Sequence, residues 1–353
     1  SSYAFLTPEL FYGANSVDLE LTRNDTDFAA RARTFNQKAA ARGIESLGQG
    51  NALYNAVAVL PDDKAMIRGS FDALSGEIHA SAKTALIEDS RFVRDAVNER
   101  IRAAFGAAAT PAMPVMAFGP GDPRPTAPES IGPVAWGEIY GAWSETDGDG
   151  NAAKLDRASG GFVTGIDGTI TRNIRLGLVA GYGHSAFDVD ERAASGSSDN
   201  VHLGLYGGGQ WDALRLSGGL AYTWHAIETN RAVVLPGFAD SLSANYDAGT
   251  FQAFGEAGYR IETGVASLEP FAGLAHVSLR TDGFAEEDGA AALSAASQTA
   301  DTTFTTLGVN ASRNFAIGSM NATAHGTLGV SYSGQIASDA QDHGFGASLA
   351  VRF

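Results

Sequence analysis

From residue 134 to the end of the chain, apolar side chains recur at every second position in one segment after another. In one such segment Val201, Leu203 and Leu205 alternate with His202 and Gly204. A period of two is the repeat of a β-strand, whose successive side chains point to opposite faces. We therefore predict ten strands, most of them with one apolar face, although the alternation is less regular in the seventh. Their expected ranges are 134–143, 159–170, 173–187, 199–210, 213–228, 248–261, 265–280, 300–314, 319–333 and 343–353.

The connections between these strands alternate strictly between long and short. An outer-membrane barrel produces this alternation, because its periplasmic turns are tight and its external loops are longer. The Greek-key connections of a soluble sandwich do not. We predict an all-β transmembrane barrel of about ten strands, with both ends on the periplasmic side, and keep a soluble β-sandwich interaction protein as an alternative. The long connections are 144–158, 188–198, 229–247, 281–299 and 334–342.

Aromatic residues near the strand ends have two interpretations. In a membrane barrel they form girdles at the two interfaces, whereas in a soluble β-protein they belong to the core. We favour the girdles, because a soluble core would leave the loop alternation without a cause. The residues are Trp136, Tyr140, Trp143, Tyr182, Trp211, Tyr222, Trp224, Tyr259 and Tyr332.

Composition limits the other classes of function. The net charge of −16 and the pI near 4.7 argue against nucleic acid as a partner, which would require a basic patch. The chain contains no cysteine, so disulfides and thiolate metal sites are excluded. No apolar run reaches the about 18 residues that a transmembrane helix needs. A spanning barrel escapes such a hydropathy search, because its apolar and polar residues alternate.

The alternation assigns a face to the strand residues. The lipid-facing set is predicted to be Leu176, Leu178, Leu203, Leu205, Leu216 and Leu220. The opposite face carries small residues, and the lumen-facing set is predicted to be Gly177, Gly181, Gly204, Gly219 and Gly258. These glycines either leave room for a helix in the lumen or only permit strand tilt and curvature. On this assignment a polar change at Ser217, on the lumen side, is expected to be mild, whereas a charge at Leu205 is not.

Three further zones precede the strands. Residues 1–25 read as short strands, and 26–105 have helical spacing, most clearly from 81 to 105. A helix over 81–105 would be about 37 Å long, which exceeds the about 30 Å of a hydrocarbon core. Residues 106–133 hold seven of the eleven prolines and read as an extended linker. Ser1-Ser2-Tyr3 is not the start of a signal peptide, so we expect a removed leader or a fragment of a longer chain.

The last predicted strand carries the pattern that sharpens this interpretation. Phe345, Leu349, Val351 and Phe353 share one face, and the sequence ends on the last of these. This resembles the C-terminal signal by which the barrel-assembly machinery recognises its substrates. Together with Gly204-Leu-Tyr-Gly-Gly208, Ala221-Tyr-Thr-Trp-His225 and Leu268-Glu-Pro-Phe-Ala-Gly-Leu-Ala275, it makes residues 134–353 similar to the autotransporter β-domain of type V secretion. Residues 7–24 resemble the last turns of a β-helical passenger, and Thr84–Asp95 the helical region before such domains.

The resemblance implies a function and partners. It implies an outer-membrane translocator and anchor, whose N-terminal passenger is exported to the cell surface while a linker helix stays in the lumen. Outer-membrane lipid, lipopolysaccharide, the barrel-assembly machinery, periplasmic chaperones and the chain's own passenger are the implied partners. The family typically has twelve strands, two more than we count, so pore width remains open. The Pro-rich linker is a second candidate for the pore occupant.

The sequence offers little for catalysis or metal binding. We predict no enzyme, no cofactor and no metal, because the hydrolase, metalloprotease and P-loop motifs are absent and the seven histidines are scattered. Asp147-Gly-Asp149 suggests a calcium loop, but Ala152 and Ala158 occupy positions that need Gly and a bidentate acid. Some relatives cut their own linker, and Asn98-Glu99 lies in the corresponding helix without a convincing motif. A pore or surface-binding barrel with a plug and no secretion role is the alternative function.

Overall fold

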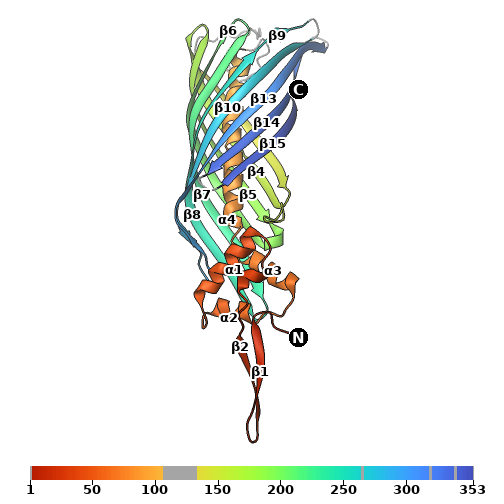
Figure 1. Ribbon diagram of the computed structural model, residues 1–353. Helices are drawn as coiled ribbons and strands as arrows, with labels where there is room; N and C mark the ends of the chain where they lie inside the picture. The colour runs from red at the N-terminus through yellow and green to blue at the C-terminus, as the bar shows by residue number, and fades with distance from the viewer. Residues whose placement is uncertain (1, 106–132, 264–265, 318–319, 338–339, 353) are drawn as a thin grey trace.

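The computed structural model describes residues 2–105, 133–263, 266–317, 320–337 and 340–352, with side chains as far as residue 311. A tall curved sheet surrounds a helix that runs along its axis, and a smaller helical unit lies at one end (Figure 1). A β-hairpin projects beyond this helical unit, away from the sheet. No helix among these residues is long and apolar enough to cross a membrane.

Ten long strands form the wall, as the sequence predicts. Each pairs antiparallel with the next long strand along the chain, and the order runs from β3 to β15. Short β9 (Ile261–Glu262) pairs with the edge of β10. Among the described residues no pairing joins β3 to β15. The long strands are β3 Val134–Thr146, β4 Leu155–Thr171, β5 Ile174–Val189, β6 Ala194–Trp211, β7 Leu214–Leu235, β8 Phe238–Tyr259, β10 Ser267–Thr281, β13 Gln298–Ile317, β14 Met320–Ala337 and β15 Ala340–Arg352.

Of the long external loops expected from the sequence, 188–198 and 229–247 are mostly strand, whereas 144–158 and 281–299 are mostly outside strands. The clearest correction concerns 229–247, which forms the outer half of the β7–β8 hairpin and turns at Pro236-Gly237. The strands continue because their far ends do not stand free in solvent: they bury apolar side chains against the helical unit. Two other outer connections contain short elements, namely the 3-10 helix Asp190–Arg192 and the strands β11 Phe284–Ala285 and β12 Ser294–Ala295, whereas residues 147–154 form neither helix nor strand.

The helical unit, residues 4–74, contains three capped α-helices. Thr34 forms a capping box with Gln37, and Asn51 and Asp63 accept hydrogen bonds from the first backbone N–H groups of the next two helices. Phe5 and Phe28 lie fully buried at its centre. The unit comprises the 3-10 helix Phe28–Arg31, α1 Phe35–Leu47, α2 Ala52–Ala58 and α3 Lys64–Ala73.

The N-terminal strands form the projecting hairpin. β1 (Leu6–Tyr12) and β2 (Val17–Arg23) pair antiparallel, with Leu10 opposite Leu19, and most of their side chains are exposed. They pair with each other rather than as parallel rungs, because the turn at Gly13–Ser16 reverses the chain. Their place at the end of a β-helical passenger stays a prediction.

The helix expected over 81–105 is two helices in line. α4 (Ile78–Asp89) and α5 (Arg91–Phe105) meet at Ser90, whose hydroxyl donates to the carbonyl oxygen of Ile87 at 2.6 Å. Both lie along the axis of the curved sheet (Figure 1). The single helical zone predicted for 26–105 therefore divides into an external unit and an enclosed pair. The predicted linker 106–133 lies outside the described residues except for Pro133.

Candidate functional site: the helices enclosed by the strand wall

The two enclosed helices contact the wall on several sides. Ile78, Leu86 and Ile87 of α4 pack with apolar residues from β4, β5, β6, β7, β8 and β10. Val93, Val97 and Ile101 of α5 pack with side chains of β4 to β7. Farther around the wall, the Phe92 ring stacks on Tyr140 of β3 at 4.2 Å between centroids, and the Arg94 guanidinium lies over the Phe304 ring of β13. We call the wall surface that faces α4 and α5 the inner face, and the opposite surface the outer face.

We call the end of the wall that carries the two-residue turns Arg172-Asn173 and Asp212-Ala213 the short-turn end. Near it, an aspartate of β4 forms ion pairs with two arginines. Asp167 accepts from Arg100 of α5 at 2.6 and 3.0 Å, and from Arg175 of the neighbouring strand at 2.7 Å. The Tyr206 hydroxyl donates to the same carboxylate at 2.7 Å, and the Trp136 indole N–H donates to Tyr206. Because Arg175 neutralises Asp167 from within the wall, this acid keeps a partner even without the helix.

A second acid–arginine cluster lies on β7, β8 and β10. Arg215 of β7 is 1% exposed and donates to Glu256 at 2.7 Å and to Glu269 at 2.6 Å. Arg102 of α5 donates to Glu256 at 2.9 Å. The pattern is the same as at Asp167: a wall arginine already pairs with the carboxylates, and a helix arginine adds to them. Such charge-assisted contacts fix the rotation and height of a helix.

Hydroxyl groups of the wall bind the middle of the enclosed helices. Asp89 accepts from the hydroxyls of Ser159 and Ser185 at 2.7 and 2.6 Å, beside the junction of the two helices. Ser217 donates to Asn98 at 2.9 Å. Ser217 is therefore buried and bonded, which the sequence did not indicate. Asn98, at the possible cleavage dipeptide, holds α5 to the wall through this contact.

Histidines on the inner face take part in side-chain networks. His202 lies 2.9 Å from Thr223, and His225 lies between Asn200 and Thr250 at 2.6 and 2.8 Å. Within the described residues no group of three metal-ligating side chains comes together. The side chain of His325 lies beyond the residues whose side chains are described.

The five glycines predicted to face the lumen lie on the inner face. A Cβ on Gly177 or Gly219 would meet Tyr206, and a Cβ on Gly181 would lie 3.3 Å from His202. Gly204 faces Ala221, and Gly258 faces Glu269. These glycines thus make room for inner-face side chains and for neighbouring strands rather than for the helix directly.

One glycine that does face the helix was missed from the sequence. A Cβ on Gly208 would lie 2.5 Å from Ile101 Cγ2 of α5 and 2.8 Å from the carbonyl oxygen of Leu216. Only a residue without a side chain permits this approach of helix to wall. The sequence could have indicated this, because Gly208 lies two and four positions after Tyr206 and Gly204 and so belongs to the same face of the strand.

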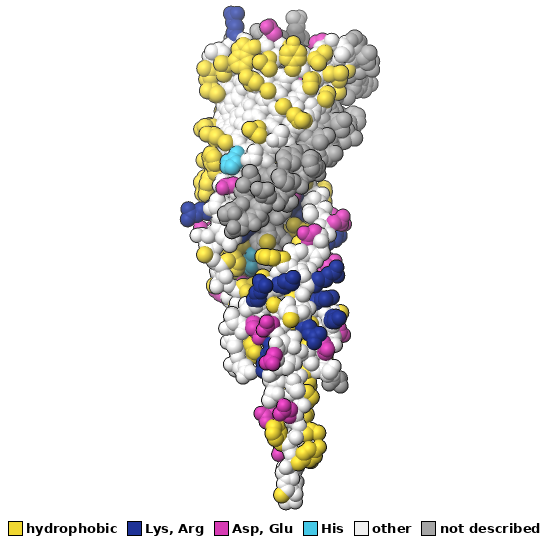
Figure 2. Space-filling model, viewed as in Figure 1, with side chains coloured by type: hydrophobic (Ala, Val, Ile, Leu, Met, Phe, Trp, Pro, Cys, Tyr) yellow, Lys and Arg dark blue, Asp and Glu magenta, His cyan; other side chains and the backbone are white. Residues whose placement is uncertain are grey.

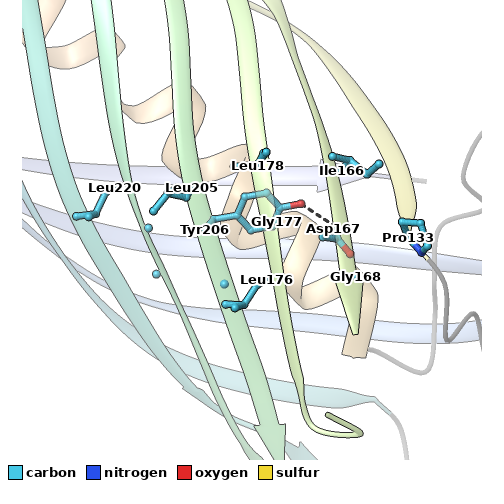
Figure 3. A pocket seen from close by; sticks show the side chains of 13 residues that line it. Pro133, Ile166, Asp167, Gly168, Leu176, Gly177, Leu178, Leu205, Tyr206 and Leu220 are labelled. Atoms are coloured by element: carbon cyan, nitrogen blue, oxygen red, sulfur yellow. Dashed lines mark hydrogen bonds between the residues drawn. The ribbon is translucent and has the colours of Figure 1, made fainter. Parts of the chain in front are cut away.

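The six leucines predicted to face lipid lie on the outer face, each with about half of its surface exposed. A hollow of about 620 Å³ lies among four of them, and glycines leave space between its apolar side chains (Figure 3). Figure 2 shows hydrophobic side chains gathered around the short-turn part of the wall, whereas charged residues gather toward the helical unit. Whether lipid covers this surface stays a prediction. The hollow is lined by Ile166, Leu176, Leu178, Leu205 and Leu220, among others.

The aromatic girdle predicted from the sequence is only partly on the outer face. Trp143, Trp211 and Trp224 are exposed there. Trp136 and Tyr140 were assigned wrongly, since they point inward to Tyr206 and Phe92. Both faces of β3 carry large side chains, so alternation alone could not tell them apart.

Two sequence features stay outside the enclosed site. Asp149 accepts from the backbone N–H groups of Ala152 and Asn151 at 2.7 and 2.8 Å, and these bonds lower its pKa. Its carboxylate thus orders its own turn. Of the predicted assembly signal, Phe345, Leu349 and Val351 lie on β15, where side chains are not described, and Phe353 lies outside the described residues.

Comparison with known proteins decides the family. The family model described as the autotransporter beta-domain matches residues 135–351, well over half of the chain. The chain belongs to the autotransporter family. It is therefore a bacterial outer-membrane protein, and its strand wall is a translocator β-domain. The resemblance that the sequence suggested is confirmed, as is the expected fold class, an all-β transmembrane barrel preceded by helices.

Similar proteins include secreted enzymes and other translocators. Two extracellular serine proteases of Serratia marcescens are 32% and 31% identical over 370 and 371 residues, covering 93% of this chain. The chain spans about a third of their length, 34%. Among solved structures, the translocator domain of NalP from Neisseria meningitidis has a TM-score of 0.49 at 17% identity, over 62% of this chain and 75% of that one. The beta domain of the Bordetella autotransporter BrkA has a TM-score of 0.47 at 16% identity, over 62% and 92%.

Proposed function

We propose that this chain is the translocator and surface anchor of an autotransporter, and that it carries an N-terminal passenger to the cell surface. One observation carries the proposal: the covalent path from the helical unit to the first wall strand passes through the inside of the wall. α4 begins beside the helical unit, and α5 ends beside the short turns, where Arg102 meets Glu256. The chain then returns to the wall at Val134.

The orientation follows from the turn lengths and the apolar belt. At the α5 end, Arg172-Asn173 and Asp212-Ala213 are two-residue connections, which is typical of the periplasmic side. The long described connections 147–154 and 282–297 lie at the opposite end, beside one two-residue turn at Pro236-Gly237. The exposed leucines lie near these turns and would contact lipid tails, whereas the charged helical unit would lie outside the cell. The inner face would then be the lumen, filled by α4 and α5.

The translocator itself carries out no chemistry in this proposal. The relatives matched over nearly the whole chain are named as extracellular serine proteases, of which the chain spans about a third. We propose a serine protease as the passenger class, with the catalytic part N-terminal to the segment described here. Its assay is the loss of secreted proteolytic activity when the active-site serine of that part is replaced.

Export is tested with an epitope tag placed before Ser1 in an otherwise full-length protein. In intact Gram-negative cells we expect an external protease to remove the tag, because the helical unit lies outside. A variant that lacks residues 78–105 should still place its β-domain in the outer membrane, but its tag should stay protected. The proposal fails if the tag of the unaltered chain stays protected while its β-domain is in the outer membrane. A barrel that conducts ions and exports nothing would then be favoured.

A further inference from the structure

The helical unit shares its hydrophobic core with the external end of the wall. Val233, Leu235 and Leu242, from the outer half of the β7–β8 hairpin, are at most 5% exposed and pack in one cluster with the buried residues of the helical unit. Ala291, from the connection between β10 and β13, completes this cluster. The core therefore crosses the boundary between a segment that precedes the enclosed helices and a segment that follows them.

Polar contacts from the described external connections surround this shared core. Asn151, between β3 and β4, accepts from the backbone N–H of Asn36 at 2.9 Å, next to the start of α1. Arg192, between β5 and β6, lies 3.6 Å from Asp72 of α3. Arg231 of β7 donates to the carbonyl oxygen of Ala73 at the end of α3, at 3.1 Å. Cations stabilise a helix C-terminus, so this last contact has the favourable sign.

The wall holds Arg231 in position without help from the helical unit. Glu286 accepts from it at 2.7 and 2.6 Å, and the carbonyl oxygen of Ala291 accepts at 2.7 Å. All three groups belong to the wall and its connections. The surface that receives α3 is thus ordered by wall contacts, and a preorganised surface loses less entropy when it binds.

We propose that this interface holds the helical unit on the translocator independently of the peptide chain between them. A cut anywhere between residues 75 and 105, including at Asn98-Glu99, would leave residues 4–74 and any passenger joined to them on the cell surface. Release into the medium would require a cut N-terminal to Ala4. The inference rests on the proposed function, since it assumes that the helical unit is outside the cell.

The test inserts a recognition sequence for a site-specific protease between Ser75 and Gly76 of the full chain, with an epitope tag before Ser1. Antibody binding to intact cells before cleavage measures export, so failure at this step counts against the proposed function alone. After cleavage, we expect the tagged fragment to sediment with the cells and to be released by urea. A fragment that enters the medium from the otherwise unaltered protein overturns the inference.

Two neighbouring valines provide a matched pair of variants. Val233→Asp places a charge in the shared core, whereas Val234→Asp places the same charge on a side chain that is 73% exposed. We expect Val233→Asp to raise the released fraction roughly tenfold or more, because a buried unpaired charge is strongly unfavourable. Val234→Asp should release no more than the parent. Equal release by the two variants contradicts the shared core as the holding contact.

A second measurement covers the case in which the insertion prevents display. Hydrogen exchange of the uncut protein, carrying only Val233→Asp or Val234→Asp, reports on α3 directly. We expect faster exchange in Lys64–Ala73 for Val233→Asp alone, with exchange in the wall strands unchanged. If α3 exchanges equally slowly in both variants, the interface does not hold the helical unit and the inference is wrong.

Discussion

At the scale of single residues, we expect the exposed apolar side chains on the outer face to divide into a group that lies in the bilayer and a group that lies beyond it. Leu205 is 56% exposed and lies six positions from Trp211 at the short-turn end. At about 2.5 Å of height per residue in a tilted strand, this places it near the middle of a core about 30 Å thick. Val234 is more exposed still, but it lies on the outer extension of β7.

We therefore expect Leu205→Arg to destabilise the refolded protein in liposomes by about 2–4 kcal/mol, and Val234→Arg by about zero. Reversible denaturant unfolding in lipid measures both. Equal tolerance of arginine at the two positions would mean that Leu205 does not face lipid. Ser217 is a poorer comparison than the sequence suggested, because its hydroxyl is buried and bonded to Asn98.

In the cluster around Asp167, we expect the loss of the acid to lower the free energy of unfolding more than the loss of the helix arginine. Asp167→Ala leaves Arg100 and Arg175 without their acceptor, and removing one partner of a buried pair costs about 3–5 kcal/mol. Arg100→Ala leaves the acid bonded to Arg175 and Tyr206, so it should cost only about 1–3 kcal/mol. Unfolding free energies of the two variants in the same lipid test this order, and the reverse order would contradict the wall-paired acid.

Glu286, outside the membrane, gives the external end a pH dependence. Burial alone would raise the pKa of this carboxyl, but hydrogen bonds from Arg231 and His79 outweigh it and hold the pKa at about 2. The unfolded value is about 4.3, so the stabilisation is complete above that pH and is lost as the pH falls toward the folded pKa. The protection of α3 against hydrogen exchange, measured relative to the intrinsic exchange rate at each pH, should therefore fall between about pH 4.5 and 2.5. In Glu286→Gln, α3 should exchange faster already at pH 6, and this acid step should be absent.

At the scale of elements, the fit of α5 against β6 depends on Gly208. Gly208→Val would bring a side chain within 3 Å of both Ile101 and a wall carbonyl, so helix or wall must move. Overpacking of this kind costs about 1–3 kcal/mol. Gly168→Val is the matched control, since nothing lies within 4 Å of its Cβ position. In planar bilayers we expect Gly208→Val alone to raise the conductance of the protein, and unchanged conductance would argue against close packing of α5 on the wall.

The elements could be predicted from the sequence where one environment covers a whole strand face. Leu203 and Leu205 alternate cleanly because their strand has an apolar outer face, and the helical spacing of 81–105 follows the stripe that packs on the wall. The strand ends beyond the apolar belt could not be predicted in this way. Val233 faces the helical unit, whereas Val234 faces solvent, and both are apolar. Pro236-Gly237, with φ of +77° at the glycine, was the available turn signal.

At the scale of the whole molecule, the described strands and the helical unit are arranged around the enclosed helices α4 and α5. The inner face contacts the enclosed helices, the external connections contact the helical unit, and the outer face presents apolar side chains. The resemblance of the sequence to a family indicated this organisation, but no motif could indicate which wall residues meet α5. Several of those contacts join residues more than a hundred positions apart, such as Ser217 and Asn98 or Arg102 and Glu256.

Single-cysteine labelling tests the orientation across the membrane, on which the proposed export depends. The chain has no cysteine of its own, so each variant carries one thiol at a known position. Asn15→Cys lies at the tip of the projecting hairpin, and Arg172→Cys lies in a two-residue turn at the opposite end. With a membrane-impermeant maleimide, Asn15→Cys should react in intact cells, and Arg172→Cys only after the outer membrane is permeabilised. Labelling of Arg172→Cys in intact cells, with Asn15→Cys protected, would contradict the account.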